Sequence, residues 1–265
     1  MNILEYIKND ENEKPLDNIV LDGGYVSILR TMICIGDSLS SGEFEAKDKD
    51  GNLSWWDMMD YSWGQFIARH AGIKVYNFSR GGMTAKEYME TYSNEFNLWD
   101  DRIKEANAFT IALGVNDMFG QHQEIGTIDD IDFADYTKNK KTFAGYYAQI
   151  IQRIQSLQPK AKIFLIGMPK ASENENEIRL KIRDLLESFT KVFKNTYLLD
   201  LYTYAPTYSG EFSDRFQLGG HMNAMGYVLS ARIIESYIDY IIRKNPDDFK
   251  EIQFVDRDLK FFWDK

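Results

Sequence analysis

Five short apolar segments are spaced along the first two hundred residues of the chain, and each is almost continuously hydrophobic rather than alternating. Strands that are covered on both faces show this pattern, because neither side of the sheet meets water. The segments are therefore predicted to form a buried parallel sheet. They cover residues 31–37, 74–79, 108–114, 161–167 and 195–201.

Patterns with the periodicity of amphipathic helices lie between these segments and after the last one. Strand and helix alternate without a break in composition long enough to be a linker. This alternation predicts an α/β fold, doubly wound, in a single domain over residues 1–265 with its core at about 30–245. The predicted helices cover residues 62–72, 83–106, 142–159, 174–194 and 223–245.

Two connections are longer than the ~2–6 residues usual between a strand and a helix, namely residues 40–61 and 115–141. Both leave the carboxyl end of a strand, the edge at which open α/β sheets bind ligands. We therefore expect a ligand pocket between them, although surface insertions without a role are the alternative.

The last twenty residues, 246–265, form an extension in which aromatic and charged side chains are mixed. We expect these aromatic side chains to cover the domain's own core, and an oligomer contact is the alternative. They are Phe249, Phe254, Phe261, Phe262 and Trp263.

The composition and net charge exclude some classes of protein and argue against some partners. Of 265 residues, 44% are hydrophobic, which is enough for a substantial core and excludes a wholly disordered chain. The formal net charge of −10 argues against nucleic acid or an anionic membrane as a partner. The N-terminus lacks a signal-like pattern, and no stretch approaches the ~18 apolar residues of a membrane span, so a soluble, cytoplasmic protein is expected.

The single cysteine, Cys34, cannot form an internal disulfide, and no cysteine pair is available for a zinc site. We expect it to be a small buried hydrophobic residue.

A candidate nucleophile follows the first predicted strand. The motif ICIGDSLSSG places Ser38 just beyond that strand, where a tight turn would expose its hydroxyl at the sheet edge. A serine nucleophile needs a positioned base, and the chain has only three histidines. His221 precedes the last helix at the same edge and is the first candidate, with His122 in a long connection as the second. His70 lies near a helix C-terminus, where a structural role is expected.

Acyl transfer also needs hydrogen-bond donors directed at the developing oxyanion. Asn116 follows the third predicted strand in IALGVND, and Gly81 and Gly82 form a glycine turn after the second in NFSRGGMT. Each of these residues is also common in ordinary turns and helix caps.

Taken together, these segments resemble the SGNH, or GDSL-type, hydrolase family. ICIGDSLSSG, NFSRGGMT, GVND and GGHMNAMGY resemble its four blocks in order and spacing across about residues 30–245. The resemblance implies a flavodoxin-like three-layer α/β/α sandwich with a five-stranded parallel sheet, and no metal or other cofactor. It also implies Ser38 as nucleophile and His221 as base. The oxyanion hole would be formed by the N–H groups of Ser38 and Gly82 with the amide of Asn116.

The chain departs from the family at one position. The family carries an aspartate three residues before the histidine, and here that residue is Leu218, which cannot accept a hydrogen bond. Asp214 is an alternative third member of the triad, but we expect a Ser38–His221 dyad in which a backbone carbonyl orients the ring. Without a carboxylate partner, the pKa of His221 is expected near ~6.5.

Two other interpretations compete with a serine hydrolase. Asp37, Asp117, His122 and His221 would be reasonable ligands of a metal-dependent phosphoesterase, although no typical metal-binding spacing is present. Asp37 is more simply explained as a residue that fixes the turn before Ser38. A noncatalytic α/β binding module is the second alternative, and the missing aspartate is the feature that favours it.

The substrate is expected to be a small ester. Trp55, Trp56 and Trp63 cluster with Tyr61 in or beside the first long connection, and aromatic faces among polar residues suit stacking on a sugar. We therefore predict a carbohydrate acetyl esterase with Trp55 and Trp56 as substrate-binding residues. Core packing of the tryptophans is the competing explanation, and the alternative activities are those of a lysophospholipase or thioesterase.

Overall fold

The computed structural model describes residues 3–259 and contains the predicted parallel sheet. Its five strands run in the order β4-β1-β5-β6-β7, and every neighbouring pair is parallel. Counted along the chain, this is the 2-1-3-4-5 order of flavodoxin-like sheets. The fold class expected from the sequence is confirmed. The strands are β1 (Thr31–Gly36), β4 (Lys74–Asn77), β5 (Ala108–Ala112), β6 (Lys162–Ile166) and β7 (Thr196–Leu199).

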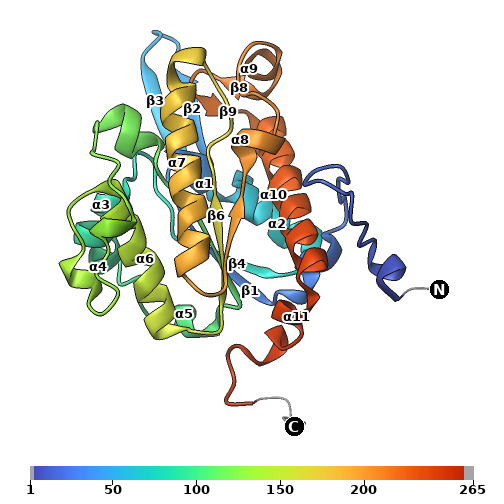
Figure 1. Ribbon diagram of the computed structural model, residues 1–265. Coiled ribbons are helices and arrows are strands. Elements are labelled where there is room, and N and C mark those ends of the chain that lie inside the picture. The colour runs from blue at the N-terminus through green and yellow to red at the C-terminus, as the bar shows by residue number, and fades with distance from the viewer. Residues whose placement is uncertain (1–2, 260–265) are drawn as a thin grey trace.

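Helices cover both faces of the sheet (Figure 1). On one face, α2 (Trp63–Ala71) packs against α10 (Ala224–Lys244). On the other lie α6 (Phe143–Leu157) and α7 (Glu173–Val192), and the short helices between β4 and β5 pack against α6. Strands enclosed in this way have no solvent-facing side, which explains why β1 and β6 are buried at every residue.

The long helix predicted over residues 83–106 is wrong, because the chain breaks there. Asn97 adopts a left-handed conformation with φ 47°, which stops the helix, and Asp100 caps a new one by accepting from Arg102 N–H. The pieces are α3 (Ala85–Glu87), a π-helical turn (Tyr88–Tyr92), α4 (Ser93–Glu95) and α5 (Asp101–Glu105).

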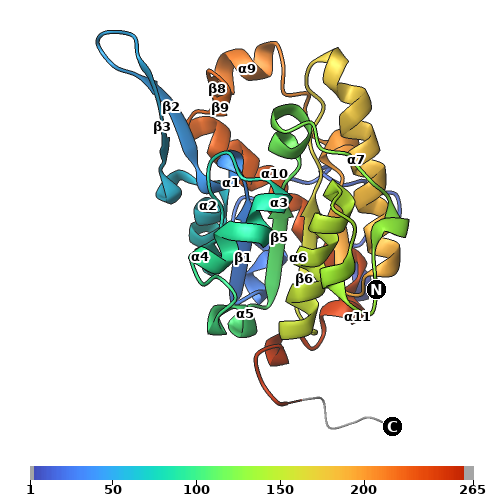
Figure 2. The ribbon, with the colours of Figure 1, turned by 90° about the vertical axis from the view of Figure 1, so that its left-hand side faces the viewer.

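The first long connection contains structure that the sequence pattern did not predict. A short helix, α1 (Ser38–Ser41), leads into an antiparallel hairpin of β2 (Glu43–Lys47) and β3 (Leu53–Asp57), which projects from the body (Figure 2). A second, smaller hairpin of β8 (Gln217–Leu218) and β9 (His221–Met222) contacts β2. The two hairpins therefore meet above the carboxyl edge of the sheet.

Short helices complete the described chain. They are α8 (Leu201–Tyr204), α9 (Glu211–Phe216), α11 (Pro246–Phe249), a π-helical turn at Asn116–Gly120, and 3-10 turns at Ile3–Ile7, Gly24–Ile28, Met59–Tyr61, Ile128–Asp130, Tyr136–Lys138 and Ile252–Phe254. None of the helices within residues 3–259 has the length and apolar character needed to cross a membrane.

The extension after residue 245 covers the core, as predicted, where the structure describes it. Phe249 is buried, with its ring beside those of Phe164 and Tyr197. Phe254 is half-buried. The remaining aromatic residues of the extension lie outside the described residues, namely Phe261, Phe262 and Trp263. Cys34 is fully buried in β1, and its thiol is free.

Candidate active site

Ser38 stands at the carboxyl end of β1, at the first position of α1. Asp37 caps this helix by accepting a hydrogen bond from Leu39 N–H at 3.1 Å, which is the turn-fixing role expected for it. A Cβ at Gly36 would collide with the Ser40 side chain, so glycine is needed for the strand to pass into the turn. The Ser38 hydroxyl has no hydrogen-bond partner among residues 3–259.

Two buried carboxyl groups lie under this turn. Burial raises the pKa of Asp37 to about 7, and the charges of Asp117 and Glu43 add to the rise. Burial likewise raises the pKa of Asp117 to about 7, although a 2.9 Å hydrogen bond from Ala85 N–H opposes the shift. Asp117 therefore holds the start of α3 in place.

His221 reaches the same edge from β9, which contacts α1. Its Nε2 lies 3.0 Å from Oε1 of Glu43, and its Nδ1 is buried without a hydrogen-bond partner in the described part of the chain. Burial lowers the pKa of His221, while the charges of Glu45 and Asp57 oppose that shift. Its environment therefore differs from the unperturbed one expected from the sequence.

Sequence reasoning missed Glu43, which is the carboxylate that contacts His221. Burial raises the pKa of Glu43, and the charge of Asp57, its cross-strand partner in the hairpin, raises it further. Asp57 itself accepts hydrogen bonds from the Ser41 hydroxyl and from Gly81 N–H. The available signal was the pair of short segments EFEAK and LSWWD, which form the two strands of this hairpin.

The three hydrogen-bond donors expected from the sequence follow β1, β4 and β5 at the carboxyl edge of the sheet. Gly82 adopts φ 72°, a conformation that favours glycine, and within residues 3–259 neither its N–H nor that of Ser38 has a protein acceptor. Asn116 begins a π-helical turn, and its Nδ2 donates to Met83 O at 3.1 Å. This bond ties Asn116 to the glycine turn and leaves the second amide hydrogen available.

The other residues considered for these roles lie elsewhere. Asp214 is exposed in α9 and makes no contact with His221, and Leu218 pairs with His221 across the β8–β9 hairpin. His122 is exposed. His70 contacts Glu235 of α10 at 3.2 Å, which fits the structural role expected for it.

The four residues considered as ligands of a phosphoesterase metal do not form a cluster. Across residues 3–259, no three His, Cys, Asp or Glu side chains are arranged to hold a metal ion.

The tryptophans divide into two groups. Trp63 is 3% exposed and belongs to the core, so for this residue the competing explanation of core packing holds. Trp55 and Trp56 are 53% and 63% exposed on β3. Trp55 pairs with Glu45, whose carboxylate accepts from Gly220 N–H at 3.1 Å, so Trp55 lies on the hairpin face turned toward His221. Trp56 pairs with Phe44 on the opposite face.

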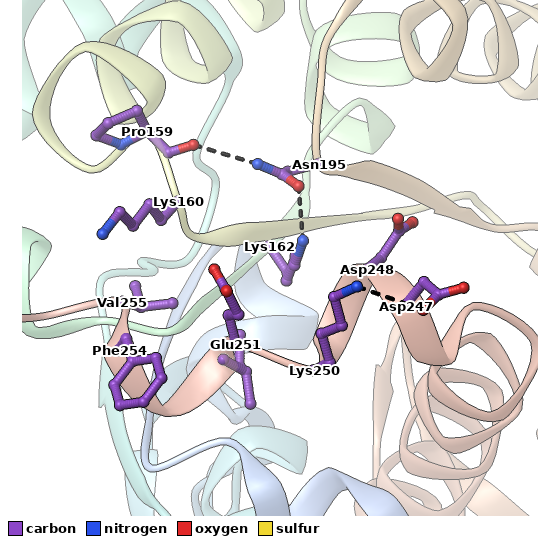
Figure 3. A pocket seen from close by; sticks show the side chains of 11 residues that line it. Pro159, Lys160, Lys162, Asn195, Asp247, Asp248, Lys250, Glu251, Phe254 and Val255 are labelled. Atoms are coloured by element: carbon purple, nitrogen blue, oxygen red, sulfur yellow. Dashed lines mark hydrogen bonds and ion pairs between the residues drawn. The ribbon is translucent and has the colours of Figure 1, made fainter. Parts of the chain in front are cut away.

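One cavity of the protein adjoins the candidate site, and another of similar size does not. One, of about 200 Å³, lies beside α1, and its largely apolar walls include Leu39, Met168 and Met222. Another, of about 240 Å³, lies near the start of β6 and β7, away from the serine (Figure 3). Two of its lysines have partners within its own walls, since Lys162 donates a hydrogen bond to the Asn195 side-chain oxygen and Lys250 forms an ion pair with Asp247. Only the first adjoins the candidate site.

A flavodoxin-like sheet with a serine after its first strand and a histidine before its last helix is the arrangement that the resemblance to SGNH hydrolases implies. The model of the GDSL-like lipase/acylhydrolase family matches residues 34–229. The chain belongs to this family, which supports an esterase or hydrolase activity at the family level.

Solved structures with the same fold include carbohydrate esterases. A family two carbohydrate esterase from Clostridium thermocellum, in complex with cellohexaose, is 17% identical with a TM-score of 0.55, and the match covers 87% of this chain and 66% of that chain. Est24, a carbohydrate acetylesterase from Sinorhizobium meliloti, is 13% identical with a TM-score of 0.52, covering 80% of this chain and 99% of that chain. No curated protein matches the sequence. At these identities the structural likeness establishes the fold alone.

Proposed function

We propose that the protein is a serine esterase that removes a small acyl group, such as acetyl, from a carbohydrate. The observation that carries the proposal is that three kinds of group without a hydrogen-bond partner among residues 3–259 come to one sheet edge, namely a serine hydroxyl, a histidine nitrogen and backbone N–H groups. The carbohydrate esterases among the structural neighbours and the exposed Trp55 support the choice of substrate.

The reaction begins when Ser38 Oγ attacks the acyl carbon while His221 takes the hydroxyl proton. The tetrahedral intermediate collapses, the bond from acyl carbon to alcohol oxygen breaks, and the imidazolium returns the proton to the departing alcohol. Water then attacks the acyl-enzyme with His221 again as base, which releases the acid and restores Ser38. The N–H groups of Ser38 and Gly82 and the Asn116 amide stabilise the oxyanion in both halves.

Trp55 provides a stacking surface for the sugar in this proposal. We expect Trp55→Ala to lower kcat/KM for acetylated sugars by about three- to tenfold through a higher KM, because only the stacking contact is lost. Turnover of nitrophenyl acetate should change little.

Trp56→Ala is the matched control, since Trp56 is equally exposed but lies on the other hairpin face. Steady-state kinetics on both substrates check the pair. Equal effects of the two substitutions on the sugar esters would contradict the assignment of the binding face.

The apolar cavity beside α1 favours a second candidate, a lysophospholipase or thioesterase that places a longer acyl chain there. A panel of acetylated sugars and long-chain lysophospholipids distinguishes the two activities. Faster turnover of the lipids would show that the substrate carries a long acyl chain and is not an acetylated carbohydrate. Absence of turnover on every ester would favour a binding module.

The pH dependence of activity should follow His221. The base must be neutral to accept a proton, and burial lowers its pKa from 6.5, so kcat/KM should fall with decreasing pH through a midpoint below 6.5. Asp37 titrates close to this range, so the ring is also followed directly by NMR in labelled protein. A midpoint above 7 for the ring resonance would show that the carboxylates outweigh burial.

A further inference from the structure

Position 218 lacks the carboxylate that would orient His221, and the hairpin after α1 supplies a carboxylate from a different part of the chain. We propose that Glu43 is the positioning residue of His221, taking the part that Leu218 cannot perform. This inference rests on the proposed function, because it assigns a role within the same proton transfer.

The contact itself is specific. Glu43 Oε1 lies 3.0 Å from His221 Nε2, and only 14% and 16% of the two side chains are exposed. A carboxylate that accepts from one ring nitrogen holds the proton there and fixes the tautomer. In the proposed arrangement Nε2–H donates to Glu43, which lies 3.0 Å away, and the lone pair is then on Nδ1, which has no partner in the described part of the chain. His221 thus keeps one unoccupied acceptor for the Ser38 proton.

Glu43 is held from both sides. Its backbone carbonyl accepts a hydrogen bond from the Tyr227 hydroxyl at 2.6 Å, which fixes the start of β2 against α10. Its second carboxylate oxygen, Oε2, rests against Gly81, where an added Cβ would overlap it. The absence of a side chain at position 81 therefore makes room for the carboxylate. This contact links the partner of His221 to the turn that carries Gly82.

The surrounding charges favour a protonated histidine during the reaction. Glu45 and Asp57 lie on the same face of the hairpin as Glu43 and act on His221, and Asp37 lies near Glu43 below α1. Tyr227 of α10 also faces Glu43. Because Glu43 is closest to the ring, removing its charge should make the imidazolium harder to form and lower the histidine's pKa.

The direct test is Glu43→Gln. Glutamine keeps the shape of the side chain, but its amide can donate to Nε2 and move the ring proton to Nδ1, which removes the acceptor. We expect kcat on nitrophenyl acetate to fall by about 10²- to 10⁴-fold, with KM changed by less than about threefold. In the residual activity of Glu43→Gln, the fall of kcat/KM with decreasing pH should occur at a lower pH than in the unaltered protein. Glu43→Asp should recover part of kcat.

Asp214→Asn is the matched control, since it removes the carboxylate that the sequence offered as an alternative third member of the triad. Asp214 does not contact the ring, so we expect a loss of less than about tenfold. A loss of about 10⁴-fold in Asp214→Asn, with Glu43→Gln active, would assign the role to Asp214 and overturn the proposal.

Gly81→Ala provides a second, independent variant that alters no titratable group. Its new methyl group should displace the Glu43 carboxylate and lower kcat, and the loss in the double variant with Glu43→Gln should be smaller than the product of the two single losses. A loss of kcat in the double variant equal to the product of the two single losses would show that the two residues act separately.

The ring nitrogens are observed by ¹⁵N NMR in Ser38→Ala. We expect Nε2 to carry the proton with Glu43 present and Nδ1 to carry it in Ser38→Ala/Glu43→Gln. An unchanged tautomer, together with unchanged kcat and pH profile in Glu43→Gln, overturns the positioning role while leaving the esterase intact. If Ser38→Ala is itself fully active, the proposed function fails instead, so the two failures are distinguishable.

Discussion

Ser38→Ala is expected to lower kcat on acyl esters by about 10⁶-fold, the scale at which removal of a serine nucleophile abolishes covalent catalysis. The substitution removes one oxygen that makes no hydrogen bond within residues 3–259, so the fold and its thermal stability should be unchanged. Hydrolysis of nitrophenyl acetate, with a circular-dichroism melt of each protein, measures both effects.

Ser40→Ala is the control for this variant. Ser40 lies two residues further along α1, and its hydroxyl is buried with no hydrogen-bond partner in the part of the chain that the structure describes. Its removal should change kcat by less than about threefold. Comparable losses in the two variants would mean that damage to α1, rather than loss of a nucleophile, explains the result.

His221→Ala is expected to cause a loss of similar size, because a serine hydroxyl without a base is a poor nucleophile at neutral pH. The substitution leaves a space where a ring with 16% exposure had been, so added imidazole should enter and restore part of the activity. The titration of kcat/KM near the histidine's pKa should disappear in the variant.

The corresponding control is His122→Ala. His122 is exposed in the connection after β5, and its removal should leave both activity and the pH profile intact. Retention of activity in His221→Ala, with loss in His122→Ala, would transfer the role of base to His122.

The sheet could be predicted from the sequence because its inner strands, β1, β5 and β6, are buried on both faces, and their continuous apolarity differs from the segments around them. The break in the helix at Asn97 could not be predicted, because the residues around it keep a helical pattern of apolar positions. A single left-handed residue and the Asp100 cap override that pattern.

The sequence predicted the positions of those candidate site residues that come shortly after the end of a strand. Ser38 and Asn116 each lie within a few residues of the carboxyl end of a strand, β1 and β5 respectively, so parallel pairing brings them to one edge. The contact between Glu43 and His221 depends instead on how the β2–β3 hairpin docks on β9, and short, half-exposed strands carry a weak pattern. The pleat of β3 places Trp55 and Trp56 on opposite faces, and the docking of the hairpin decides which of the two is turned toward His221.

Covalent labelling of the intact protein with a serine-directed organophosphonate tests the central claim most directly. Mass spectrometry of peptides from the labelled protein should locate one adduct on Ser38, formed in parallel with loss of esterase activity. Labelling should be absent in Ser38→Ala and strongly slowed in His221→Ala, because the base activates the hydroxyl. An unlabelled Ser38, or an adduct on another residue that accounts for the inactivation, would contradict the account.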